Sequence, residues 1–317
     1  SHLSSIRKLP QQLHPKDAFS TMLVLVTGGT GFLGGHLVHE LLSRGHRIRC
    51  LVRSTTIPTS LQGLSMELAA GDVTQPATLA EACTDAEAII HLAAIIQEKG
   101  LATFHRVNTG GTRNLVAAAQ SAGVRRFVYI SNLGVTGPDP GYPFLHSKWL
   151  GEKTVRESDL YHTILRPSVL FGTEDRFVNM LADIIRRVPV VPIIGSGAAQ
   201  FQLISAAEVA YCLATALEEH RFIGQTVELG GPEHMSYEDI IDLIIRTLGT
   251  NRLKLHIPVP LMRPVVWLME RLLPQPPLTS QQLKMLDRDN ITGLDAVEKW
   301  FGFRPTPLGQ ETGYIHR

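Results

Sequence analysis

A glycine-rich turn between an apolar run and a helical pattern constrains this fold most strongly. Leu23–Val26 is apolar throughout, as is typical of a buried parallel strand. Thr27-Gly-Gly-Thr-Gly-Phe-Leu-Gly34 follows, and then a helical pattern that Gly45 ends. Glycines spaced three apart let a pyrophosphate approach backbone amides at the positive end of the helix. The segment predicts a dinucleotide site, and a tight turn without a ligand is the alternative. The candidate contacts are Gly28, Thr30, Gly31, Phe32, Leu33 and Gly34.

The end of the second expected strand bears on cofactor choice. Residues 47–52 read as a strand, and Arg53 follows it. An NAD-selective site would place an acid near this position for the ribose hydroxyls. A guanidinium instead suits a 2′-phosphate. The sequence therefore favours NADP(H), and NAD(H) is the alternative cofactor. Arg53 could also have no role in binding and simply be a solvated arginine at the end of the strand.

Strands alternate with helices along most of the chain. Expected strands at 66–70, 88–94, 126–130 and 161–165 are separated by helical patterns, one of them opening at residues 107–109. This order predicts an α/β fold with a doubly wound parallel sheet and a ligand at the carboxyl ends of the strands. Asp72, after the third strand, is expected to bind an adenine amino group or to cap a turn.

The expected domains follow from these patterns. Residues 1–21 are polar, contain Pro10 and Pro15 and show no period, so we interpret them as a leader or extension. Residues 22–171 form the expected dinucleotide-binding domain, which also receives about 203–230. Residues 172–317 form mainly a smaller lobe over the ligand, with a helix over 177–188 and a capping pattern from Ser236 to Asp239.

Composition excludes several classes of function. The net charge is +1 and no run of like charge occurs, which argues against nucleic-acid binding. Three scattered cysteines form neither a metal-type nor a redox pair, so we expect no metal site and a reduced, cytoplasmic location. No apolar run approaches the roughly 20 residues that span a bilayer.

Several segments together resemble an extended or atypical short-chain dehydrogenase/reductase of the epimerase/dehydratase type. They are TGGTGFLG, GDV, HLAA, VNTGGTRNL, SKWLGE and LRPSVLFG, in the order of the family. Residues 165–179 are similar to the subgroup of the NADPH-binding accessory subunit of respiratory complex I and its bacterial relatives. The resemblance implies a Rossmann fold. It also implies further cofactor contacts at Val73, Leu92, Ala93, Ala94, Asn108, Pro167, Ser168 and Val169.

The resemblance also implies a proton-transfer set of serine, tyrosine and lysine. Lys148 matches the lysine, which in the family also binds the nicotinamide ribose. Phe144 occupies the tyrosine position and has no proton to give. Asn132 aligns with the serine, and a shift of one residue would restore Ser131.

Two nearby side chains are candidates for a substitute proton donor. Tyr142 lies in the preceding loop, across Pro143. His146 follows Phe144 by two positions and would point off its helical face. An ordered water is a third source.

The second lobe offers two polar candidates for a substrate cleft, Arg176 and Gln202. Structural roles, such as an ion pair with Asp175 or a loop hydrogen bond, are the alternatives. Pro264–Leu273 is apolar around much of its circumference. We expect a helix docked in the protein or a partner contact, rather than a membrane-surface helix.

Two functions from different classes fit these observations. The preferred one is an NADP(H)-holding structural, assembly or redox-sensing protein with a degraded site, weak or no turnover and a protein partner. The alternative is an active reductase, dehydrogenase or sugar-nucleotide epimerase/dehydratase with a non-standard donor, acting on a small carbonyl or sugar-nucleotide substrate. The residues at 132 and 144 favour the first, whereas the fold cannot decide.

Overall fold

The computed structural model describes residues 21–54, 57–273, 276, 278–286 and 288–315. The leader expected at 1–21 therefore lies almost wholly outside the described residues. Within them no helix is long and apolar enough to cross a bilayer.

A seven-stranded parallel sheet forms the centre of the molecule, in the order β11-β6-β5-β4-β1-β2-β3. Its strands are β1 (Leu23–Thr27), β2 (Arg47–Val52), β3 (Glu67–Ala70), β4 (Ala88–His91), β5 (Arg126–Ile130), β6 (Tyr161–Pro167) and β11 (Thr226–Leu229). The strand order reverses between β1 and β4, which is where open α/β sheets bind ligands. The expected doubly wound α/β fold is confirmed.

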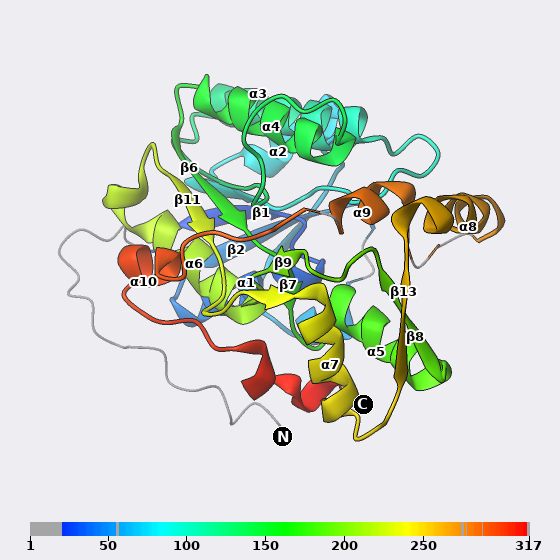
Figure 1. Ribbon diagram of the computed structural model, residues 1–317. Helices are drawn as coiled ribbons and strands as arrows, with labels where there is room; N and C mark the ends of the chain where they lie inside the picture. The colour runs from blue at the N-terminus through cyan, green and yellow to red at the C-terminus, as the bar shows by residue number, and fades with distance from the viewer. Residues whose placement is uncertain (1–20, 55–56, 274–275, 277, 287, 316–317) are drawn as a thin grey trace.

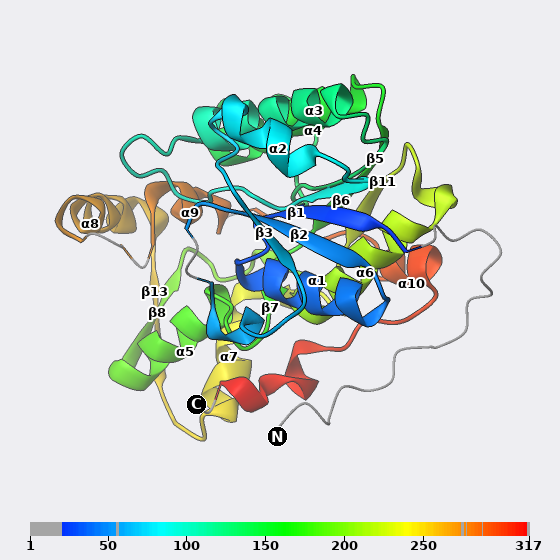
Figure 2. The same cartoon turned by 180° about the vertical axis from the view of Figure 1, so that it is seen from behind.

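Helices cover both faces of this sheet (Figures 1 and 2). One face carries α2 (Leu79–Cys83), α3 (Gly111–Ser121) and α4 (Pro143–Arg156), and the other carries α1 (Phe32–Ser43) and α6 (Ala206–Glu218). Each face has its own buried apolar cluster, centred on Leu25 and Ile89 on one side and on Val24 and Val26 on the other. Successive side chains of β1 point to opposite faces of the sheet and so contribute to both apolar layers.

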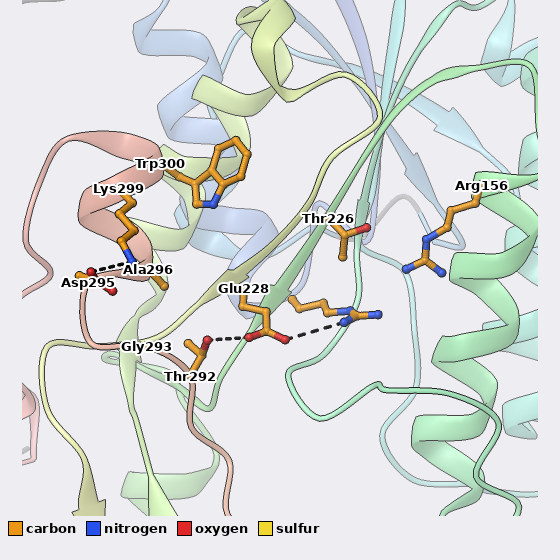
Figure 3. Close-up of a pocket in the computed structure, with 10 residues that line it drawn as sticks. Arg156, Thr226, Glu228, Thr292, Gly293, Asp295, Ala296, Lys299 and Trp300 are labelled. Atoms are coloured by element: carbon orange, nitrogen blue, oxygen red, sulfur yellow. Dashed lines mark hydrogen bonds and ion pairs between the residues drawn. The ribbon is translucent and has the colours of Figure 1, made fainter.

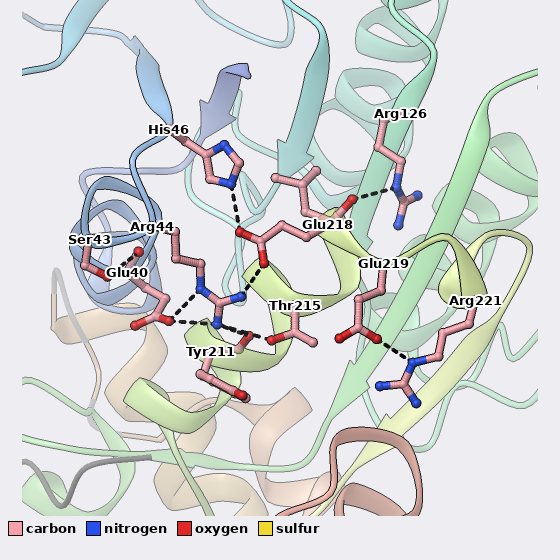
Figure 4. A network of polar contacts seen from close by, with 11 residues as sticks. Glu40, Ser43, Arg44, His46, Arg126, Tyr211, Thr215, Glu218, Glu219 and Arg221 are labelled. Carbon is pink, nitrogen blue, oxygen red and sulfur yellow. Dashed lines mark hydrogen bonds and ion pairs between the residues drawn. The ribbon is translucent and has the colours of Figure 1, made fainter. Parts of the chain in front are cut away.

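A polar network fixes α1 against α6 (Figure 4). Arg44, at the end of α1, pairs with Glu218 at 2.6 Å and Glu40 at 2.8 Å and donates to the Thr215 hydroxyl at 3.2 Å. His46 Nε2 lies 2.9 Å from the other Glu218 oxygen. Because α1 begins at the glycine turn, these contacts also hold that turn in place.

The smaller lobe has its own core. It contains the short strand pairs β7 (Leu170–Phe171) with β10 (Ile204–Ser205), β9 (Gln200–Phe201) with β12 (Met235–Ser236), and β8 (Val190–Ile194) with β13 (Leu253–Ile257). Its helices are α5 (Phe177–Arg187), α7 (Tyr237–Thr247), α8 (Val259–Leu272) and α9 (Ser280–Met285), whereas α10 (Ala296–Phe301) packs beside β11. The expected capping box at Ser236 and Asp239 starts α7.

Helix α8 differs from the docked helix that its apolar sequence suggested. It lies at the edge of the molecule in both views (Figures 1 and 2). Val266 is its only buried residue, while Leu261, Trp267 and Leu272 are 64%, 51% and 69% exposed. Docking within this chain therefore covers one narrow face. A partner contact stays a prediction.

Candidate functional site

The glycine turn after β1 leaves the start of α1 open. Gly28 has φ +73°, and a Cβ there would lie 2.9 Å from the Ala93 amide nitrogen. A Cβ at Gly34 would overlap the carbonyl oxygen of Gly28. Gly31 caps α1 without any side-chain hydrogen bond. Only glycine fits at positions 28 and 34, and the amides at the start of the helix remain available to an anion.

A cleft of about 2350 Å³ runs from this turn over the carboxyl ends of the sheet into the smaller lobe. All six predicted contacts in the turn line it. So do Val73, Leu92, Ala93, Ala94, Pro167, Ser168 and Val169. The elements that border the switch point of the sheet thus converge on one space, as the topology requires.

Arg53 borders the cleft one residue after β2. Its side chain is exposed and makes no ion pair or hydrogen bond with the rest of the described chain. A permanently charged fork without a protein partner can bind a phosphate at little desolvation cost. The NADP(H) preference stays a prediction.

Asp72 lines the same cleft, half-buried. One of its carboxylate oxygens accepts the Thr74 amide at 2.8 Å. Asp72 therefore caps this turn through one carboxylate oxygen. Its second oxygen takes no part in that hydrogen bond. Adenine binding by Asp72 stays a prediction.

Asn108 does not border the cleft, in contrast to its expected place among the cofactor contacts. It is buried in a π-helical turn, His105–Gly110, that precedes α3. Its Oδ1 accepts the Ile95 amide at 2.8 Å, and its Nδ2 donates to the Ile95 carbonyl and the Ser147 hydroxyl, both at 3.0 Å. These bonds engage the carboxamide and tie the loop after β4 to α4.

Lys148 lies under the cleft on α4. It is 2% exposed, and its Nζ donates to the Ile130 carbonyl at 2.6 Å and lies 4.5 Å from the centre of the Tyr129 ring. Burial lowers the pKa of Lys148 to about 7, although the Glu152 carboxylate acts in the opposite direction. An ammonium and a neutral amine are therefore both accessible near neutral pH.

Glu152 supplies the charge opposite Lys148. Burial opposes its ionisation and is the largest effect, but the hydrogen bonds from Arg166, at 2.8 and 2.7 Å, together with the positive charges of Arg166 and Arg156, hold the pKa below its usual value. Arg166 also lies 3.8 Å from Glu228. A line of alternating charges therefore runs from Lys148 to the edge of the sheet.

A second, smaller pocket of about 490 Å³ lies at that edge, beside β11 (Figure 3). Its Glu228 carboxylate accepts the Thr292 hydroxyl at 2.6 Å. Lys299, which also lines it, pairs with Asp295 at 2.8 Å. The charged groups of this pocket thus have partners in the pocket or, for Arg156 and Arg166, in the buried Glu152, and none of the predicted site residues lies in it.

Phe144 sits four residues before Lys148, in the first turn of α4. Its ring lines the cleft and packs on Phe104, with ring centres 5.7 Å apart. It is 7% exposed and clusters with Val135 and Leu145. The side chain at the expected proton-donor position therefore belongs to an apolar wall.

The two candidate substitute donors lie away from the cleft. Tyr142 stacks under the Arg288 guanidinium, 4.5 Å from the ring centre. His146 Nδ1 accepts the Asp139 amide at 3.2 Å, and its ring stacks on Trp149. Neither lines the cleft. These contacts engage both rings, and the Tyr142 ring also packs against the apolar cluster that contains Phe144.

Ser131 and Asn132 both border the cleft at the end of β5. Ser131 is 2% exposed, and its amide donates to the Leu165 carbonyl at 2.7 Å. Asn132 is half-buried. Position alone does not select between them for the serine role, which stays a prediction.

The two candidates of the second lobe differ in their placement. Arg176 is exposed and lines the cleft, without the ion pair to Asp175 considered from the sequence. Gln202 is fully buried away from it, so its expected place facing the cleft is wrong. Its Nε2 donates to the Gly231 carbonyl and its Oε1 accepts the Thr292 amide, both at 2.7 Å. Gln202 therefore has the loop hydrogen-bonding role.

His91, at the end of β4, is a buried polar residue behind the cleft that the sequence did not single out. Its Nδ1 lies 2.6 Å from the Thr27 hydroxyl and its Nε2 3.0 Å from that of Thr112. Burial lowers its pKa to about 3, and the charge on Lys148 adds to this effect. A neutral imidazole thus ties the end of β1 to α3. A histidine inside an otherwise apolar strand was the signal for it.

Comparison with known families shows to which family this chain is related. The model of the NAD dependent epimerase/dehydratase family matches residues 24–230. This chain belongs to that family. The resemblance to extended short-chain dehydrogenases/reductases is therefore confirmed.

Individual known proteins are similar to this chain over different lengths. A ceramide reductase of Caulobacter vibrioides is 37% identical over 172 residues, which is 54% of each chain. Subunit 9 of the NADH dehydrogenase 1 alpha subcomplex of Arabidopsis thaliana is 25% identical over 89% of this chain and 72% of its own. The crystal structure of gox2253 matches with a TM-score of 0.73 and 27% identity, over 93% of this chain and 96% of its own.

Proposed function

We propose that this protein holds NADP(H) in the cleft with weak or no turnover, and serves as a structural, assembly or redox-sensing component. The family is NAD-dependent by description, and glycines 28 and 34 leave the room at the helix start that a pyrophosphate requires. Arg53 would hold the 2′-phosphate, and Lys148 is the candidate for the ribose. When bound, NADPH supplies a hydride.

One observation carries the low turnover in this proposal. The side chain four residues before Lys148 is a phenyl ring in an apolar cluster, and the nearest proton-bearing rings, Tyr142 and His146, are held outside the cleft. A carbonyl reduced at this place would lack the general acid that typically accelerates such steps about 10²–10⁴-fold. Similarity to a complex I subunit supports a role that needs cofactor rather than turnover.

The test is to titrate NADPH into the protein by calorimetry and to follow reduced nicotinamide absorbance in the same sample with a panel of aldehydes and ketones. We expect saturable binding and almost no oxidation. Rapid oxidation that Tyr142→Phe or His146→Ala abolishes would show an efficient substitute donor and contradict the proposal.

An active reductase is a second candidate because of the state of Lys148. With a pKa of about 7, its ammonium can give up a proton near neutral pH. In that case the rate of NADPH oxidation should fall as pH rises through about 7, because the amine becomes neutral. Lys148→Met should abolish this dependence.

A further inference from the structure

The cleft is larger than one ligand requires. Small-molecule sites typically measure about 300–1,000 Å³, whereas this cleft measures about 2350 Å³. The proposed cofactor contacts lie on the sheet and on the start of α1. The remainder of the cleft is bordered by different elements, namely the start of α4 together with α5, α8 and α9.

This second part of the cleft has an apolar, adaptable lining. It includes Phe144, Met180, Ile184, Met262, Met269 and Met285, of which four are methionines on the three helices α5, α8 and α9. Unbranched thioether side chains adapt to ligands of irregular shape. Polar substrates such as sugar nucleotides would find few partners among these side chains.

Arg176 at the start of α5 has no ion pair among the described residues, but three other charged groups that border this part are engaged by the protein. Glu270 accepts hydrogen bonds from the Ser280 amide and hydroxyl at 2.9 and 2.6 Å. Arg288 pairs with Asp139 at 3.1 Å, and Asp289 accepts the Gln200 amide at 2.8 Å. Because these charges already have partners, they do not provide a polar ligand with a counter-charge.

Helix α8 joins this interior lining to the outer surface. Met262, Val266 and Met269 face the cleft. Several other apolar side chains of the helix are turned outward, among them Trp267 and Leu268 at 51% and 50% exposed. Arg271 lies over the Trp267 ring at 4.3 Å. A helix with tryptophan, leucine and arginine on its outer face is suited to a lipid surface.

We propose that the part of the cleft between α4, α5, α8 and α9 binds a long-chain lipid beside the cofactor. The continuous apolar surface of α8 provides the way in from a lipid surface. This inference rests on the proposed cofactor position, because the cofactor on the sheet leaves this part of the cleft free.

The first test measures chain-length dependence in the NADPH-saturated protein. Fluorescent alkyl probes with one head group and 8, 12 or 16 carbons are titrated separately. Burial of one methylene contributes about 0.8 kcal/mol, so affinity should rise by up to about fourfold per methylene. Equal affinities for the three probes, or no binding, would overturn the proposal.

A matched pair of variants locates the probe. Met269→Glu places a charge in the lining and should weaken binding of the 16-carbon probe at least tenfold. Leu268 precedes Met269 and lies on the outer face of α8, so Leu268→Glu should leave that affinity within twofold. An equal loss in both variants would place the probe on the outer surface.

Displacement of the probe by an amphipathic peptide at lower concentration than by unlabelled lipid would assign the space to a protein. Either result would overturn the proposal.

NADPH affinity measured separately in Met269→Glu distinguishes the two proposals. Unchanged NADPH binding with loss of the probe supports the lipid site and shows that the variant folds. NADPH binding by the parent without any probe binding overturns the lipid site alone. Probe binding without any NADPH binding supports the lipid site and contradicts the proposed cofactor role.

Discussion

At the scale of single residues, two positions on α4 have opposite surroundings. Phe144 packs in an apolar cluster, whereas Lys148, four residues later, donates to the Ile130 carbonyl and is acted on by the negative charge of Glu152. A phenyl ring is buried without needing a polar partner, but a tyrosine there would have to direct its hydroxyl to a partner or into the cleft. Without a hydroxyl, the side chain at the position that the resemblance assigns to the proton donor forms part of an apolar wall.

The first prediction concerns Arg53, the exposed arginine at the end of β2. Its guanidinium should favour NADPH over NADH by about 1.5–3 kcal/mol, the range of hydrogen bonds to charged groups. Arg53→Ala should remove this preference in calorimetric titrations of both cofactors. Arg47→Ala, at the opposite end of the same strand, is the control and should retain it. Equal affinities of the parent for both cofactors would exclude the role of Arg53.

At the scale of elements, the sequence predicted local features better than distant contacts. The strand, the glycine turn and α1 were predictable because backbone room and hydrophobic period are properties of neighbouring residues. Asn108 and Gln202 were misplaced because their partners, Ile95 and Thr292, come from segments whose positions only the fold defines. For α8 the sequence left a docked helix and a partner contact open, since apolar sequence alone does not reveal how much of a helix its neighbours cover.

Helix α6 gives a prediction about pH. Burial raises the pKa of Glu208 to about 7, although the Thr306 amide and hydroxyl donate to its Oε1 at 2.8 and 2.9 Å. The folded state thus binds a proton that the unfolded state releases near pH 4.5. This contribution is complete below that pH and is lost as pH rises through about 7, by up to about 3 kcal/mol.

Glu208→Gln tests this by removing the titration while keeping an oxygen acceptor for Thr306. Urea unfolding at pH 5 and pH 8 should show the parent losing more stability than the variant across this interval. Thr306→Val is the control, because it removes the hydrogen bond from the Thr306 hydroxyl and keeps the Glu208 carboxyl group. An identical pH dependence of the parent and Glu208→Gln would remove Glu208 as the cause.

At the scale of the whole molecule, the cleft between the sheet and the smaller lobe couples binding to folding. A ligand that binds only the native state adds about 2.7 kcal/mol of stability at a hundredfold excess over its dissociation constant. We therefore expect NADPH to raise the melting temperature of the parent. Gly31→Val, at the start of α1, should abolish the shift.

Gly35→Val is the matched control, because a Cβ at Gly35 meets no atom within 4 Å. Its melting temperature without cofactor should differ from that of the parent, and NADPH should still raise it. A normal response of Gly31→Val would mean that the glycine turn is not the phosphate site.

The most direct test of the central claim is the rate of NADPH oxidation by Phe144→Tyr beside that of the parent, with aldehydes of graded chain length. The variant places a phenol four residues before Lys148, on the same face of α4. We predict almost no oxidation by the parent and a gain of about 10²–10⁴-fold in the variant, the usual range for general acid catalysis. Oxidation by the parent at a rate equal to that of the variant, or no gain on restoring the hydroxyl, would contradict the account.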